Sequence, residues 1–182
     1  MCGRSTCRGD TMITARRGIT MMEVVIGTLL VGMVLAATLN IIGPTVRATK
    51  LAGDEVLAAQ FVEELLAEIA AQPYRDPTDD AGVIGPESGE TGSNRSKFDD
   101  VDDYNGWTDS IQSTSGVARA GLKGSWSRAA KVVWIDPDDP ATEVGTDLGA
   151  KRVTVSVSLA GTRLATQSII RTEGFDASRE ID

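Results

Sequence analysis

A single carboxylate, Glu23, lies at the start of a long apolar run and calls for a chemical explanation. The run from Val24 to Gly43 holds 20 residues without a formal charge, which is about the length that crosses a ~30 Å hydrocarbon core as a helix. An acidic side chain that enters such a core costs free energy, so carboxylates there usually serve a function and have a partner. We therefore expect Glu23 to pair with a cationic group, since an anchor alone does not require it.

A cationic partner for Glu23 could arise from the residues directly upstream. Arg16 and Arg17 precede Gly18. If the chain is cut after Gly18, Ile19 carries a new α-amino group four residues before Glu23. The two groups then lie about one helical turn apart within one chain, and they could also pair between neighbouring subunits. The expected chemistry is therefore proteolysis by another enzyme, followed by ion pairing.

Residues 17–23, followed by the apolar run, resemble the processing site of type IV prepilins and type II secretion pseudopilins. The resemblance is specific over residues 16–43 and only general beyond them. In that family a membrane peptidase cuts after the glycine and methylates the new amine, and a glutamate at the fifth mature position guides docking into a helical filament. The resemblance implies cleavage between Gly18 and Ile19, N-methylation of Ile19 and filament docking by Glu23. The family usually has Phe as the first mature residue, so Ile19 departs from its pattern.

Two other interpretations of the apolar run compete with this one. An ordinary signal peptide has an apolar region of 7–15 residues that ends in a small-residue cleavage site, whereas this run is longer and begins beside a charge. An uncut single-pass anchor that carries a periplasmic ligand-binding or enzymatic domain remains the alternative, and it leaves Glu23 unexplained. Four arginines precede the run: Arg4, Arg8, Arg16 and Arg17. The N-terminus is therefore expected in the cytoplasm and the chain after Gly43 in the periplasm, with the inner membrane between them.

The composition limits the partners of the chain. Its 182 residues support one domain and an anchor, and 18 basic against 26 acidic side chains give a net charge of −8. Removal of the arginine-containing leader would make the mature chain more acidic still. Nucleic-acid binding requires basic surface that displaces counterions. We therefore expect no nucleic-acid partner, which also disfavours a DNA-capturing competence pilin.

The residue types present argue against an enzyme. The chain has no histidine, and so lacks the commonest general base and the commonest metal ligand. Both cysteines, Cys2 and Cys7, lie in the expected leader. The mature protein would then contain no disulfide. No arrangement of carboxylates or of serine and lysine predicts catalysis, and we expect neither catalytic residues nor a required cofactor.

The N-terminal part of the chain is predicted to be one long helix in two halves. Residues 1–18 form the leader and residues 19–43 the membrane and filament-core helix, where Gly27 and Gly32 would allow close helix packing. Residues 44–72 form the soluble half, with a kink or break expected at Pro44 and an end at Gln72, before a proline. Apolar residues at three- and four-residue spacing mark one face of this half: Leu51, Leu57, Ala58, Phe61, Val62, Leu65 and Ile69.

Residues 73–116 are predicted to be a variable, acidic loop region, with short apolar pieces at 82–84 and 111–112 that could form minor strands. Oxygen-bearing side chains in it offer a weak Ca²⁺ candidate set: Asp99, Asp100, Asp102, Asp103 and Asn105. The EF-hand spacing fails, because Val101 stands where its first aspartate belongs. We therefore assign no metal and favour a solvated acidic turn, with Tyr104 and Trp107 packed inward.

Residues 117–182 are predicted to form an antiparallel sheet of three or four strands. Alternating apolar and polar residues indicate strands at 125–135, 153–159 and 163–171. Trp126 and Trp134 are expected in the core or on the sheet face. The apolar face of this sheet and the apolar stripe of the helix would cover each other, which gives an α+β, pilin-like fold.

The predicted function is that of a minor pilin or pseudopilin, a structural and assembly subunit of a type IV pilus-like or type II secretion filament. The expected partners are the prepilin peptidase, other pilin or pseudopilin subunits and the inner membrane. The precursor would wait in that membrane and later enter the filament through its N-terminal helix.

Overall fold

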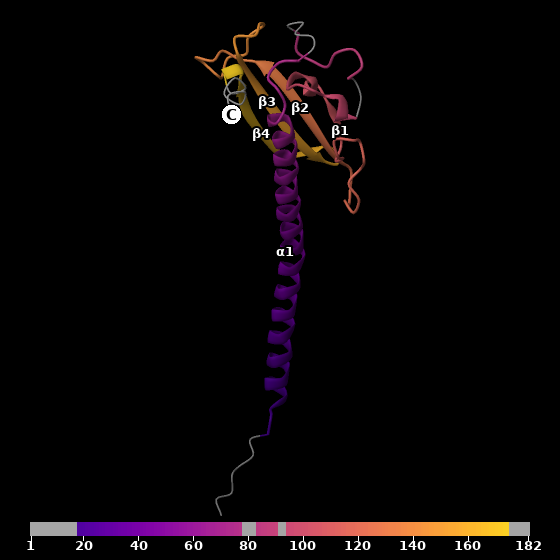
Figure 1. The fold of residues 1–182 in the computed structure, drawn as a ribbon. Helices are drawn as coiled ribbons and strands as arrows, with labels where there is room; N and C mark the ends of the chain where they lie inside the picture. The colour runs from indigo at the N-terminus through magenta and orange to yellow at the C-terminus, as the bar shows by residue number, and fades with distance from the viewer. Residues whose placement is uncertain (1–17, 78–82, 91–93, 175–182) are drawn as a thin grey trace, which may run out of the picture. The chain divides into compact units, whose positions relative to one another are not determined.

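The computed structural model describes residues 18–77, 83–90 and 94–174 (Figure 1). Its elements, in chain order, are helix α1 (Met21–Ala70), the short 3₁₀ helices η1 (Arg95–Lys97) and η2 (Asp102–Tyr104), and strands β1 (Thr108–Ser110), β2 (Trp126–Trp134), β3 (Ala150–Leu159) and β4 (Thr162–Thr172). The chain divides into two compact units, Met1–Ala48 and Thr49–Asp182. The division falls within α1.

The first unit contains the apolar part of α1, which is long and apolar enough to cross a membrane. All its described residues are exposed. Three threonines within this part satisfy their hydroxyl hydrogen bonds internally: Thr28, Thr38 and Thr45 each donate to a backbone carbonyl three or four residues earlier at 2.8–3.0 Å. Such internal bonding is what a hydrocarbon environment demands. A kink or break was expected at Pro44. The helix continues through this residue, so the break does not occur, and the kink stays a prediction.

The second unit contains a four-stranded sheet in the order β1-β2-β3-β4, with every neighbouring pair antiparallel. The three long strands fall where the alternation in the sequence predicted them. The fourth, β1, lies in the predicted loop region 73–116 and not within residues 117–182, so the sheet begins earlier in the chain than predicted. Ala160 and Gly161 form the tight turn between β3 and β4, and both have positive φ, 50° and 81°. Such a turn matches the twist of the flanking strands. Of the two minor strands expected in the loop region, Gln112 makes an isolated bridge to Ala118, and residues 83 and 84 are not in a strand.

The core of the second unit lies between the C-terminal part of α1 and one face of the sheet. Phe61 packs edge-on against Trp126, with ring centroids 5.5 Å apart. The buried residues of α1 are Ala58, Phe61, Val62, Leu65, Leu66 and Ile69, and the strands contribute Trp126, Ala130, Val132, Val153, Val155 and Val157. Tyr104 and Trp107 from the loop region are buried in the same core, as predicted. The fold is therefore α+β, with the helix packed on the antiparallel sheet.

The end of α1 is tied to the sheet by Arg171 of β4. The helix ends at Ala70, two residues earlier than predicted. The guanidinium of Arg171 donates to the carbonyls of Ala70 and Gln72 at 2.8 and 2.9 Å. The last carbonyls of a helix lack partners within it, and a cation there also favours the helix dipole. Arg171 thus satisfies the carbonyl of the last helical residue and one carbonyl of the segment that follows it.

Truncation of Leu65, which is fully buried in α1, tests this packing. Leu65→Ala is expected to lower the free energy of unfolding by about 2–5 kcal/mol, because it leaves a cavity beneath the sheet. Leu51→Ala, the same change at an exposed position of the same helix, should cost less than about 1 kcal/mol. Urea unfolding of the full-length protein in detergent, followed by tryptophan fluorescence, measures both. Equal losses would contradict the burial of this face.

Candidate functional site

The predicted processing site lies directly before α1 and is exposed. Gly18 and Ile19 are not helical, and 76% of the surface of Ile19 is accessible. The helix begins at Met21. Arg16 and Arg17, which belong to the same motif, lie outside the described residues. A peptidase could therefore reach the bond between Gly18 and Ile19 without unwinding the helix.

Glu23 lies in the first turn of α1, where it has a local structural role. Its backbone amide donates to the hydroxyl of Thr20 at 3.3 Å and to the carbonyl of Thr20 at 3.0 Å. Thr20 thus caps the helix, and the two residues have the spacing of a capping box. A carboxylate in the first turn is also favoured by the helix dipole. The capping bonds use only the backbone amide of Glu23, so its carboxylate is favoured by the dipole alone. That contribution gives an anchor some use for an acidic residue here, so the presence of Glu23 does not by itself establish docking.

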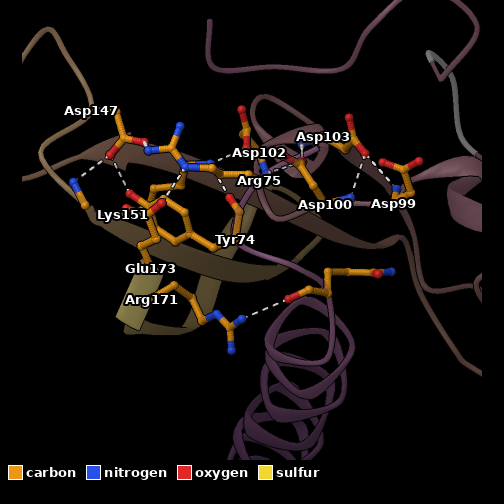
Figure 2. A network of polar contacts seen from close by, with 12 residues as sticks. Tyr74, Arg75, Asp99, Asp100, Asp102, Asp103, Asp147, Lys151, Arg171 and Glu173 are labelled. Carbon is orange, nitrogen blue, oxygen red and sulfur yellow. Dashed lines mark hydrogen bonds and ion pairs between the residues drawn. The ribbon is translucent and has the colours of Figure 1, made fainter. Parts of the chain in front are cut away.

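The acidic run at residues 99–103 forms a tight turn that its own carboxylates hold together (Figure 2). Oδ2 of Asp103 accepts hydrogen bonds from the amides of Asp99 and Asp100 at 2.8 and 3.2 Å. Oδ1 of Asp100 accepts from the amides of Asp102 and Asp103 at 2.7 and 3.1 Å. Aspartates commonly order turns in this way. The turn is where the sequence placed it, but Asp100, Asp102 and Asp103 are buried and not solvated.

A buried ion pair joins this turn to β3. The ammonium of Lys151 donates to Oδ1 of Asp102 and to the carbonyl of Tyr74, the latter at 2.6 Å. It also lies 4.4 Å from the centroid of the Tyr74 ring, a distance at which a cation is attracted to the ring face. Lys151 therefore holds the turn, the strand and the segment after α1 together.

The same network extends to Asp147, in the segment before β3 (Figure 2). The hydroxyl of Tyr74 donates to Asp147 at 2.6 Å, and burial together with this carboxylate raises the pKa of Tyr74. The guanidinium of Arg75 lies 3.4 Å from Asp147 and 2.9 Å from Glu173. The chain that leaves α1 is thus fixed to two loops at the end of the sheet.

Two arginines that sequence reasoning did not single out are also buried. Arg95 forms a two-pronged ion pair with Glu68 of α1, at 2.7 and 3.0 Å, and its guanidinium lies 4.4 Å from the centroid of the Trp107 ring. Burial opposes the charge of Glu68, but Arg95 outweighs it and lowers the pKa of that carboxyl. Arg128 of β2 donates to the carbonyl of Gln112 at 2.6 Å. These contacts attach the loop region to the helix and to the sheet.

The side chains that the sequence offered for Ca²⁺ do not converge as a set. Asp102 binds Lys151, and the side-chain oxygen of Asn105 accepts a hydrogen bond from the amide of Val132 at 3.1 Å. Among the described residues, the group of carboxylates that could hold a metal ion consists of Asp103 with Glu87 and Glu90. Sequence reasoning did not find the two glutamates, because a Glu-x-x-Glu spacing in a glycine-rich loop is common.

Two carboxyl groups in this region, those of Glu87 and Asp103, have a raised pKa. Burial, helped by Glu90 and Asp103, raises the pKa of Glu87 to about 7. Burial also raises the pKa of Asp103, although the amides of Asp99 and Asp100 oppose the shift. These shifts show that the region disfavours several negative charges at once.

Comparisons with models of protein families, with curated proteins and with solved structures found no match. The architecture itself is pilin-like. It consists of one long, membrane-capable N-terminal helix whose C-terminal part packs on a four-stranded antiparallel sheet.

The Lys151 network gives a prediction for stability. Lys151→Met should lower the free energy of unfolding by about 3–5 kcal/mol, because Asp102 would keep a buried charge without its partner. Lys131→Met removes an exposed lysine that lies 3.5 Å from Glu143 at the surface of the same sheet, and it should cost less than about 1 kcal/mol. Chemical denaturation of both variants measures the difference. If the two variants lose the same stability, the buried pair does not hold the acidic turn on β3.

Proposed function

We propose that this chain is the precursor of a minor pilin or pseudopilin, a structural subunit of a type IV pilus-like or type II secretion filament. The observation that carries the proposal is the processing motif, which contains an exposed, non-helical Gly18–Ile19 bond directly before a membrane-capable helix. The pilin-like packing of the same helix on an antiparallel sheet supports it. In this function the chain is a substrate and a building block, not an enzyme.

Processing would supply the charge that Glu23 needs in a filament. Hydrolysis of the Gly18–Ile19 bond consumes one water molecule and leaves a carboxylate on Gly18 and an amine on Ile19. The prepilin peptidase would then transfer a methyl group to this amine from a sulfonium methyl donor that the peptidase binds, with loss of one proton from the nitrogen. The N-methylated amine takes up a proton again at neutral pH and remains cationic. In the low dielectric of a helix bundle its attraction for a carboxylate on a neighbouring subunit is stronger than in water.

The exposed apolar side chains of the first unit would provide a second favourable contribution to filament assembly. The side chains from Val24 to Ile42 are exposed in the single chain, and either lipid or neighbouring helices would cover them. Gly27 and Gly32 have open space at the position of a Cβ atom, so a neighbouring helix could approach closely at these points. The precursor would therefore reside in the inner membrane, with the second unit in the periplasm, and exchange lipid contacts for subunit contacts on assembly.

Cleavage is the direct test of this function. In cells that contain a prepilin peptidase, mass spectrometry of the N-terminal peptide should find N-methylated Ile19 as the first residue. Gly18→Val should leave the leader attached, because the peptidase must accommodate the residue before the cut. Gly9→Val, the same change elsewhere in the leader, should be processed normally. An intact Met1 terminus on the unmodified chain would reject the function and favour the uncut anchor.

A second test separates docking from helix capping. Glu23→Gln removes the charge but keeps the backbone amide that Thr20 caps, whereas Thr20→Ala removes the cap and keeps the charge. Both variants should be cleaved. Glu23→Gln should reduce incorporation into filaments by about tenfold or more, because an amine left unpaired in a low dielectric costs several kcal/mol, and Thr20→Ala should reduce it much less. Immunoblots of sheared filaments measure incorporation, and the reverse order would mean that the Thr20 cap matters more than the Glu23 charge, which would contradict docking by that charge.

A further inference from the structure

Three carboxylates from two separate segments meet in the loop region of the second unit. Glu87 and Glu90 lie on one turn, where the amide of Glu90 donates to the carbonyl of Glu87 at 3.3 Å. Asp103 belongs to η2, thirteen residues further along the chain. One oxygen from each carboxylate lies within 4.8 Å of the other two. The glutamates are partly exposed and Asp103 is buried, so the group has an open side and a closed side.

Asp103 provides a second and independent observation, because part of its carboxylate is buried without any donor. Only 1% of the residue is exposed. Its Oδ2 is used by the amides of Asp99 and Asp100, but its Oδ1 has no hydrogen-bond partner among the described residues. Figure 2 shows this oxygen pointing away from the two amides. A buried carboxylate oxygen without a donor costs free energy. A cation bound at this oxygen would remove that cost.

The neighbouring groups do not supply that partner. Lys97, the lysine that contacts this loop, donates to the carbonyl of Gly89 at 3.1 Å and not to a carboxylate. The neighbouring Asp99 is itself acidic, and burial and nearby carboxylates raise its pKa. In the described part of the chain, no arginine or lysine forms an ion pair with Glu87, Glu90 or Asp103. Like charges held this close destabilise a fold unless one of the groups takes up a proton or a cation lies between them.

We propose that Glu87, Glu90 and Asp103 bind one Ca²⁺ ion. The donor atoms are all carboxylate oxygens, which hard cations prefer over the softer metals that favour nitrogen and sulfur. Ca²⁺ takes six to eight oxygens in a flexible geometry, whereas Mg²⁺ demands a near-ideal octahedron and keeps several waters. Glu87 and Glu90 are partly exposed, so water from the solvent side would complete the coordination of the ion. The ion would fasten the 83–90 loop to the turn that Lys151 holds on the sheet.

Calcium binding can be measured on the full-length protein in detergent, after treatment with a chelator. Titration calorimetry with CaCl₂ should give one site per chain. Thermal unfolding followed by tryptophan fluorescence should shift upward by about 5 °C or more when Ca²⁺ is present at ~100 times its dissociation constant. Excess EGTA should reverse the shift. MgCl₂ at the same concentration should raise the unfolding temperature by less than about a third of the Ca²⁺ shift. An equal shift with Mg²⁺ would overturn the assignment to Ca²⁺.

A paired substitution makes the test specific to this site. Glu87→Gln combined with Glu90→Gln should weaken Ca²⁺ binding by about tenfold or more and abolish the thermal shift. Without Ca²⁺ this variant should be at least as stable as the unmodified protein, because the repulsion between the carboxylates is removed. If the two glutamates only held the loop in place, their substitution would instead lower the stability. Glu55→Gln combined with Glu63→Gln changes two exposed carboxylates of α1 and should leave Ca²⁺ binding unchanged.

Two results would overturn the proposal: no heat of binding from the unmodified protein, or an unchanged Ca²⁺ response in the Glu87→Gln, Glu90→Gln variant. The measurement is independent of the filament function, because it does not require cleavage or assembly. Failure of the Ca²⁺ proposal therefore does not imply failure of the proposed filament function, and the reverse also holds.

Discussion

The burial of one face of α1 against the sheet is the interaction on which the rest of the second unit depends. Between Ala58 and Ile69 the helix has an apolar residue at nearly every inward position. Strands β2 and β3 present the matching apolar face. Neither surface would be stable alone, because a single amphipathic helix and a small sheet each leave apolar area in water. Their contact places the end of the helix beside the strands.

Charged side chains complete this packing where the chain has no regular structure. Arg171 binds the last carbonyls of the helix, Arg95 binds Glu68, and Lys151 binds Asp102. Each pair joins segments that are far apart in the sequence. Buried pairs of this kind add little net stability compared with apolar residues, but removal of one partner is costly. In this chain they determine where the long loop region lies on the core.

Some residues had signals in the sequence that sequence reasoning did not use. Arg128 alternates in phase with Trp126, Ala130 and Val132, so the period of two already placed it on the buried face of β2. Thr20 and Glu23 have the spacing of a capping box, and the structure contains its first half, the bond from the amide of Glu23 to the hydroxyl of Thr20. Arg95 had no such signal, since its burial depends on Glu68 and Trp107 from other elements.

The sequence by itself determined the long helix, its apolar N-terminal half, the amphipathic stripe after Gly43 and the three long strands. These features are local, because periodicity and turn residues act over a few positions. Only the tertiary structure decided which charges are buried, and that Glu87 and Glu90 meet Asp103 while Asp102 meets Lys151. The reason is physical: burial and electrostatic pairing depend on distance in space, and the packing of helix on sheet sets those distances for residues that the sequence separates.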